Sequence, residues 1–221
     1  MNGPARSLEE LLQFVRARTV PGPVPLVPEI VLQQATELTA LWHATASDPA
    51  GWDDSPFWAF PWAGGQALAR HLLDLPALVR GRRAVDFGTG SGLVAIAAAR
   101  AGAAEVLCLD RDPFCAAAVA INAERNGVGV LFRSGDAIGD PLPGCEVLLA
   151  GDVFYERSLA ERALPWFRAL AGRGVLVLAG DAGRHYAPRD AFEVRATCDV
   201  PTTLEIEDAP NKRARVLRIL P

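Results

Sequence analysis

The sequence lacks a clustered basic surface and a long hydrophobic run. It carries 26 acidic and 22 basic side chains, a net charge of −4, and its basic residues gather only at Lys212, Arg213 and Arg215. Binding to a phosphate backbone needs a clustered basic face, so we expect no nucleic-acid partner. The apolar runs, such as residues 93–99 and 174–179, are far shorter than the ~20 residues that cross a bilayer, so we expect no membrane partner.

Targeting and metal-binding patterns are also missing. The N-terminus has no hydrophobic secretory core, and Glu9 and Glu10 argue against a transit peptide, so we expect a cytoplasmic protein. The four cysteines include no close pair with the spacing of zinc or redox sites, and the three histidines lie far apart, so no metal is implied. With 221 residues, 50% of them hydrophobic, the chain can form one α/β domain with a short N-terminal extension.

A glycine-rich turn between a strand and a helix is the most informative feature that is present. Residues 84–97 read AVDFGTGSGLVAIA. Such a turn presents backbone N–H groups and the positive end of a helix to a ligand that carries carboxylate or hydroxyl oxygens. Gly88, Gly90 and Gly92 form an Asp-x-Gly-x-Gly-x-Gly pattern, whereas Gly90, Gly92 and Ala95 also fit the dinucleotide pattern. The turn therefore predicts a nucleotide-type cofactor without naming it.

Asp110 ends the second expected strand, residues 105–110. A carboxylate at this point can accept hydrogen bonds from both ribose hydroxyls, in a nicotinamide dehydrogenase or in an S-adenosylmethionine (AdoMet) enzyme. Asp110 therefore predicts a bound ribose and leaves both cofactors possible. Asp112, two residues later, is predicted to cap the next helix.

The fourth expected strand, residues 146–151, leads into an acid and two aromatic residues, Asp152, Phe154 and Tyr155. Ligands of open parallel sheets lie beyond the carboxyl ends of the strands, so this cluster should border the reacting group. A nicotinamide dehydrogenase has no need of such a cluster, which favours AdoMet.

Two segments resemble a known family. Residues 151–155, GDVFY, and residues 56–68, PFWAFPWAGGQAL, are similar to segments of the seven-strand protein-lysine methyltransferases that act on the electron transfer flavoprotein β subunit. The resemblance covers about residues 20–221. It implies an α/β, Rossmann-like class I methyltransferase fold, with a mostly parallel seven-stranded sheet of order 3-2-1-4-5-7-6 and helices on both faces. It also implies AdoMet as the cofactor and a protein substrate that presents a lysine, with the electron transfer flavoprotein β subunit as the suspected substrate.

The resemblance assigns roles to single residues. Asp136, after a third strand near residues 129–133, would face the adenine amino group. Asp152 and Tyr155 would recognise the substrate lysine, and with Phe154 they form the predicted catalytic set, in which Asp152 orients the ammonium and the rings form a dry wall. The predicted cofactor-binding set is Trp62, Asp86, Gly88, Thr89, Gly90, Gly92, Asp110, Asp136, Ala137 and Gly151.

The pattern divides the chain into an N-terminal helical extension with a cofactor-covering loop, residues 1–64, and a methyltransferase domain, residues 65–221. Apolar spacing predicts a helix over residues 7–18 and a second one from Pro28 to Leu41. Strands and helices then alternate as in parallel βαβ units until residues 192–198 and 213–220, which predict an antiparallel pair of strands at the sheet edge.

Other functions fit the same core. A methyltransferase acting on a ribosomal protein or on a small-molecule amine would keep it, although ribosomal-protein and amide-methylating enzymes commonly carry an asparagine where Asp152 stands, so the aspartate favours an amine. A NAD-dependent oxidoreductase is the outside enzyme alternative. A cofactor-binding protein without turnover is the third, because a fold does not prove activity.

Overall fold

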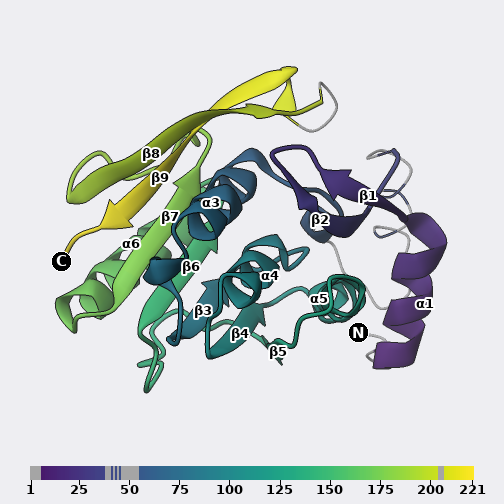
Figure 1. Ribbon diagram of the computed structural model, residues 1–221, viewed down its shortest axis with the longest axis horizontal. Coiled ribbons are helices and arrows are strands. Elements are labelled where there is room, and N and C mark those ends of the chain that lie inside the picture. The colour runs from purple at the N-terminus through teal and green to yellow at the C-terminus, as the bar shows by residue number, and fades with distance from the viewer. Residues whose placement is uncertain (1–5, 38–40, 42, 44, 46–54, 204–206) are drawn as a thin grey trace.

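The computed structural model (Figure 1) describes residues 6–37, 41, 43, 45, 55–203 and 207–221. Its centre is a seven-stranded sheet in the order β5-β4-β3-β6-β7-β9-β8. β9 pairs antiparallel with β7 and β8, and the other pairs are parallel. Counted within this sheet alone, the order is 3-2-1-4-5-7-6, because β1 and β2 form a separate sheet. The strands are β3 (Arg83–Phe87), β4 (Glu105–Asp110), β5 (Leu131–Ser134), β6 (Val147–Gly151), β7 (Leu176–Asp181), β8 (Phe192–Pro201) and β9 (Asn211–Ile219).

Helices cover both faces of this sheet, as predicted (Figure 1). Alternate residues of β3 show how: Ala84 belongs to a buried cluster shared with α3 and α4, whereas Val85 and Phe87 belong to a second cluster packed against α6. Strands that are apolar at successive positions are typical of parallel sheets buried on both sides. The helices are α3 (Ala63–Asp74), α4 (Leu93–Arg100), α5 (Pro113–Arg125) and α6 (Arg157–Gly172), with short 3-10 turns η1 (Phe57–Ala59) and η2 (Pro76–Leu78).

The first predicted helix is confirmed as α1 (Leu8–Arg18). Ser7 accepts a hydrogen bond from the Glu10 N–H and the Glu10 carboxylate accepts one from the Ser7 N–H, at 2.8 Å, so the helix begins with a capping box. Phe14 packs on Phe114 of α5, with ring centroids 4.8 Å apart, which fixes α1 against the domain.

The helix predicted to begin at Pro28 is wrong over its described first part. Residues Val20–Val24 (β1) and Val27–Gln34 (β2) form an antiparallel hairpin instead. Ile30 and Leu32 are fully buried on one face, the two-residue period of a strand, and they join the cluster of α3 and α4. Leu38, on which the helical pattern also relied, lies outside the described residues.

Side chains of α5 complete the hydrogen bonding of the hairpin. The β2 backbone N–H groups of Val31 and Gln33 donate to the side-chain oxygens of Asn126 (3.1 Å) and Asn122 (2.7 Å). Asn122 also donates to the Ser91 carbonyl in the glycine turn, at 2.8 Å. A single buried asparagine therefore connects the N-terminal hairpin to the predicted cofactor site. Among the described residues, no helix has the length and apolar composition that spanning a bilayer requires.

Candidate active site

The glycine turn connects the end of β3 to the start of α4, as the sequence predicted. Gly88, Gly90 and Gly92 all have positive φ, at 65°, 51° and 81°. These are backbone conformations that glycine adopts without steric cost. Asp86, 1% exposed, fastens the turn: one of its oxygens accepts from the Thr89 hydroxyl at 2.6 Å and from the Ala95 N–H of α4 at 3.1 Å. Burial raises the pKa of Asp86 to about 7, although both hydrogen bonds lower it.

Asp110, at the end of β4, holds the turn from the other side. Its two oxygens accept hydrogen bonds from the N–H groups of Gly90, at 2.9 Å, and Asp112, at 3.0 Å. Asp112 caps α5 as predicted, accepting from the Phe114 N–H at 2.8 Å. Each Asp110 oxygen accepts one of these hydrogen bonds and has a second lone pair. That capacity is what a pair of hydroxyl donors would use.

A pocket of about 250 Å³ lies along the carboxyl ends of the strands, beside this turn. Among the described residues of its wall are ten of the predicted site residues: Trp62, Asp86, Gly88, Thr89, Gly90, Asp110, Asp136, Gly151, Asp152 and Tyr155. The structure therefore brings together predicted residues from five separate segments of the chain. In the described part of the chain, no group of three or more metal-ligating side chains is positioned to hold a metal ion.

Asp136 lines the pocket from the loop after β5. One of its oxygens accepts from the Ile138 N–H at 3.0 Å, and the other pairs with Arg162 of α6. The hydrogen bond from Arg162 lowers the pKa of this half-exposed carboxyl, so it carries a charge near neutral pH. Leu109 and Ile138 add apolar wall beside it.

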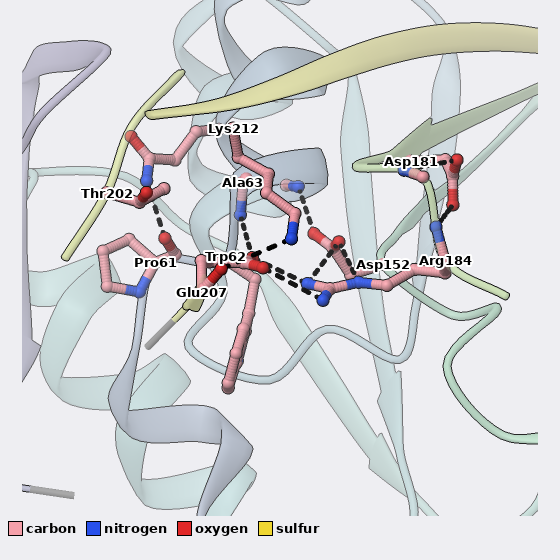
Figure 2. Close-up of polar contacts among 12 residues, drawn as sticks. Pro61, Trp62, Ala63, Asp152, Asp181, Arg184, Thr202, Glu207 and Lys212 are labelled. Carbon is pink, nitrogen blue, oxygen red and sulfur yellow. Dashed lines mark hydrogen bonds and ion pairs between the residues drawn. The ribbon is translucent and has the colours of Figure 1, made fainter. Parts of the chain in front are cut away.

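Asp152 stands directly after β6, with a φ of 55° and an exposed fraction of 7%. One oxygen accepts from the Gly65 N–H in the first turn of α3, at 2.8 Å. The other accepts from Nε of Arg184 at 2.9 Å and lies 2.8 Å from Nη2 of the same side chain. The carboxylate is therefore bound by a helix N-terminus and by a guanidinium, as Figure 2 shows.

Glu207 binds the adjacent edge of the Arg184 guanidinium. The pair is bidentate, with Nη1–Oε2 at 3.0 Å and Nη2–Oε1 at 2.7 Å, and Glu207 also accepts from the Ala63 N–H at 3.2 Å. Burial raises the pKa of Asp152 to about 6, while Arg184 and the Gly65 N–H oppose the rise. Burial disfavours the charge on Arg184, but Asp152 and Glu207 together raise its pKa.

Close backbone contact lets α3 reach these acids. A Cβ atom on Gly64 would lie 2.5 Å from the Gly180 carbonyl oxygen and 2.7 Å from the Asp152 carboxylate. A Cβ on Gly151 would lie 2.9 Å from the Cα of Gly65. Glycines at these positions allow the start of α3 to pack directly on the ends of β6 and β7, which brings its positive end to Asp152.

Aromatic rings line the pocket beside Asp152. The Phe57 ring lies 5.6 Å from that of Trp62 and 5.1 Å from that of Tyr155, and Nε1 of Trp62 donates to the Phe57 carbonyl at 2.9 Å. Phe57 and Tyr155 are 39% and 42% exposed, so they form the open edge of the pocket. The Arg184 guanidinium lies 5.6 Å from the centre of the Trp62 ring, within the range of a cation–π interaction.

Comparison with known proteins shows the family of the chain. A protein from Xenopus laevis described as "Electron transfer flavoprotein beta subunit lysine methyltransferase" is 39% identical over 174 residues, which is 77% of this chain and 70% of the relative. The chain belongs to this family. A Danio rerio protein of the same description is 39% identical over 162 residues, which is 72% of this chain, and the chain spans 62% of that relative's length.

Two further matches concern part of the chain and its fold. A family model described as "Ribosomal protein L11 methyltransferase (PrmA)" matches residues 71–136. The crystal structure of a ribosomal protein L11 methylase from Lactobacillus delbrueckii subsp. bulgaricus is 19% identical with a TM-score of 0.55, covering 90% of this chain and 100% of that one. This likeness establishes the same Rossmann-like methyltransferase fold.

One predicted catalytic residue of the family motif does not face the pocket. The Phe154 side chain is 0% exposed and packs among the apolar residues beneath α6, with its ring centroid 6.3 Å from that of Phe167. Contrary to the prediction, the structure places Phe154 outside the described wall of the pocket, where Val153 is found instead. Tyr155 does lie at the pocket.

Two predicted cofactor residues lie behind the wall. Gly92 closes the turn with an N–H bond to the Thr89 carbonyl at 2.8 Å, and a Cβ there would meet Val119 at 3.2 Å. Ala137 is 4% exposed within the cluster against α6. Among the described residues that line the pocket, neither is found, so their part in cofactor binding stays a prediction.

Sequence reasoning missed Arg184, Glu207 and Phe57. Arg184 follows β7 at the carboxyl edge of the sheet, the same signal that identified Asp110 and Asp152, and this signal could have found it. Glu207 comes from the segment between β8 and β9, where no motif marks it. Phe57 has no role in the predicted site, and the structure places it in the wall of the pocket.

Proposed function

We propose that this protein transfers a methyl group from AdoMet to a lysine side chain of a protein, with the electron transfer flavoprotein β subunit as its substrate. Family membership supports the reaction class. The observation that carries the proposal is the position of Asp152, which lines the same pocket as the glycine turn and is bordered by aromatic rings. A carboxylate beside aromatic faces suits a side-chain ammonium and not a neutral amide.

The residues of the pocket fit AdoMet by their chemistry. Asp110 would accept from the ribose hydroxyls, Asp136 would accept from the adenine amino group, and Leu109 and Ile138 would contact the adenine faces. The glycine turn would meet the carboxylate of the methionine part, and Trp62 would lie beside it. When bound, AdoMet supplies an electrophilic methyl group on a sulfonium.

The remaining chemistry belongs to the protein. A free lysine has a pKa of ~10.4 and is almost entirely protonated near neutral pH, so the site must bind an ammonium and then favour the neutral amine. Asp152 would attract and orient the ammonium, whereas the apolar faces of the Trp62 and Tyr155 rings beside it would favour the uncharged form. Alignment of the amine contributes several kcal/mol in well-positioned reactions of this kind.

The test uses labelled AdoMet and recombinant electron transfer flavoprotein β subunit, with mass spectrometry to locate the modified residue. We expect transfer to lysine, abolished in Asp152→Ala with AdoMet affinity retained, whereas Asp110→Ala loses AdoMet affinity first. Asp190→Ala, a change at an exposed carboxylate paired with Arg168, is the matched control. Calorimetry that showed the reverse order of effects for Asp152 and Asp110 would refute both assignments.

A ribosomal protein is the second candidate substrate, because the matching family model describes methyltransferases of this kind. That model ends at residue 136, before Asp152, Tyr155, Arg184 and Glu207, so it covers the proposed cofactor half and not the proposed lysine half. Purified ribosomal protein offered in the same assay would decide, since preferential labelling of it would replace the flavoprotein as substrate. We propose a protein and not a nucleic acid as the acceptor, on the unclustered basic residues of the sequence.

A further inference from the structure

Arg184 presents a positive charge to the same pocket that would receive the substrate ammonium. Both Asp152 and Arg184 line the pocket, whereas Glu207 is not among its described lining residues and binds the Nη1–Nη2 edge of the guanidinium. An amine that reaches Asp152 therefore meets a carboxylate and a guanidinium together. The role that the sequence predicts for Asp152 does not take this guanidinium into account.

The contacts of Arg184 are too many for simple displacement by an incoming amine. Its side chain, 19% exposed, makes two contacts with Asp152 and a bidentate pair with Glu207, at 2.7–3.0 Å. Its backbone N–H donates to the buried carboxylate of Asp181 at 3.2 Å. Bidentate guanidinium–carboxylate pairs are among the strongest hydrogen-bonded contacts in proteins, so the guanidinium stays in place.

A carboxylate alone beside the substrate would oppose the reaction. Asp152 favours the charged ammonium and so raises the pKa of the lysine, although only the neutral amine has the lone pair that attacks a methyl group. A fixed cation paired with the same carboxylate lowers the pKa of the lysine. On this ground, and resting on the proposed lysine methyl transfer, we propose that Arg184, held by Glu207, offsets the charge of Asp152 beside the substrate amine, so that the amine loses its proton inside the site.

The proton balance is simple. The ammonium gives one proton to water at the open edge formed by Phe57 and Tyr155, and the nitrogen keeps the electron pair. Asp152 remains ionised and orients the amine, and Arg184 keeps its protons throughout. Glu207 acts as a positioning residue, because it binds the guanidinium but is not one of the described residues that line the pocket.

The net charge around Asp152 is the sum of the charged groups that contact it and their neighbours. Asp152, Glu207 and Arg184 sum to −1, and Asp181 is balanced by Arg215, at 3.4 Å. The Lys212 ammonium donates to the Glu207 backbone carbonyl at 3.3 Å, and the His185 ring packs on Tyr186. The Arg157 guanidinium lies 5.7 Å from the centre of the Tyr186 ring. At the start of α3, the Ala63 N–H donates to the Glu207 carboxylate and the Gly65 N–H donates to the Asp152 carboxylate. The charged groups Asp181, Arg215, Lys212 and Arg157 are left unaltered in variants of Arg184 or Glu207.

Three variants change or restore the summed charge of Asp152, Glu207 and Arg184. Arg184→Gln takes the three-residue sum from −1 to −2, Glu207→Gln takes it to 0, and the double variant restores −1. A unit charge at 4–6 Å shifts a pKa by about 1 to 3 units. We therefore expect the pH midpoint of methyl transfer to rise by about one unit or more in Arg184→Gln, to fall in Glu207→Gln, and to return toward the wild-type value in the double variant. Arg184→Lys, which keeps the charge, should stay closer to wild type than Arg184→Gln.

The measurement is the single-turnover rate at saturating AdoMet and recombinant electron transfer flavoprotein β subunit, from about pH 6 to pH 10, because rates in the bound complex report groups in that complex. A second substrate with aminoethylcysteine at the modified position, an amine with a lower intrinsic pKa, identifies the limb that belongs to the amine and not to Asp152. Thermal unfolding and calorimetric affinity for S-adenosylhomocysteine show that each variant is folded.

Opposite shifts in the two single variants support the proposal, since loss of folding cannot move a midpoint in both directions. An unmoved midpoint in Arg184→Gln, or shifts of the same sign in both single variants, would overturn it while leaving lysine methylation by the wild type intact. A wild-type protein that methylates no lysine would overturn the proposed function itself, and this inference with it.

Discussion

Replacing Phe154 by alanine would remove a fully buried ring from the core beneath the site. The ring is 0% exposed and packs against Phe167 in the cluster between the sheet and α6. Phenylalanine-to-alanine changes in such cores cost about 3 to 5 kcal/mol, through lost burial and the cavity left behind. In a domain of this size each kcal/mol lowers the midpoint of thermal unfolding by about 2 to 4 °C. The expected decrease is therefore about 6 to 20 °C.

Tyr155→Ala is the matched comparison at the next position. Its ring is 42% exposed at the pocket edge and contacts Phe57, so its removal should lower the unfolding midpoint by no more than a few degrees. Because Tyr155 lines the pocket and Phe154 does not, the loss of methyl transfer should be larger for Tyr155→Ala, measured below the unfolding range of both variants.

Thermal unfolding followed by circular dichroism, together with the labelled-AdoMet assay, separates the two effects. If Phe154→Ala unfolded within about 2 °C of wild type but lost methyl transfer, Phe154 would act at the site and the assignment of its ring to the core would be refuted. If Tyr155→Ala kept full activity, the role of the aromatic edge in lysine binding would fail instead.

Three other changes test separate parts of the structure. Burial raises the pKa of Asp86 from 3.8 to about 7, so the contribution of this carboxyl to stability is lost as pH rises through that range. The stability of Asp86→Asn relative to wild type should therefore increase between about pH 4 and pH 7, by up to about 4 kcal/mol. A difference in unfolding midpoint that stayed constant across pH would contradict this. Asn122→Ala leaves the Gln33 N–H and the Ser91 carbonyl without their partner, so it should destabilise the protein by about 1 to 3 kcal/mol in urea unfolding and increase amide exchange in β2, whereas unchanged exchange would show that the hairpin is held otherwise. Gly64→Ala places a Cβ 2.7 Å from the Asp152 carboxylate, so it should reduce methyl transfer more than AdoMet affinity; equal loss of both would place the effect in the fold as a whole.

Much of the fold could be predicted because local chemistry and tertiary packing agree along residues 84–151. Asp86, the positive-φ glycines and Asp110 each form the contacts that their sequence pattern indicates. The N-terminal hairpin could not be predicted in this way. The apolar residues around Ile30 fit a helical spacing as well as a strand, and what favours the strand is a pair of asparagines 89 to 95 residues away that satisfy its backbone.

The site shows a similar division. The strand-end rule placed Asp110 and Asp152 at one pocket, which is what the structure has. The same rule does not say which of Phe154 and Tyr155 faces the pocket; in the structure Phe154 is buried in the core and Tyr155 lines the pocket. Glu207 reaches Asp152 only through Arg184, so its role depends on tertiary structure that no local pattern in the sequence contains.

Asp152 shows why the network around Arg184 is needed at all. Burial raises its pKa from 3.8 to about 6, so its contribution to stability is present below the unfolded pKa and is lost as pH rises through about 6. The ionised form that binds an ammonium is thus the form that destabilises the free protein, and Arg184 together with the Gly65 N–H offsets part of that cost. A second cation at Asp152 would offset more of it. Binding of the substrate ammonium should therefore strengthen above about pH 6, while the fixed charge of Arg184 prevents Asp152 from holding the lysine in its unreactive, protonated form.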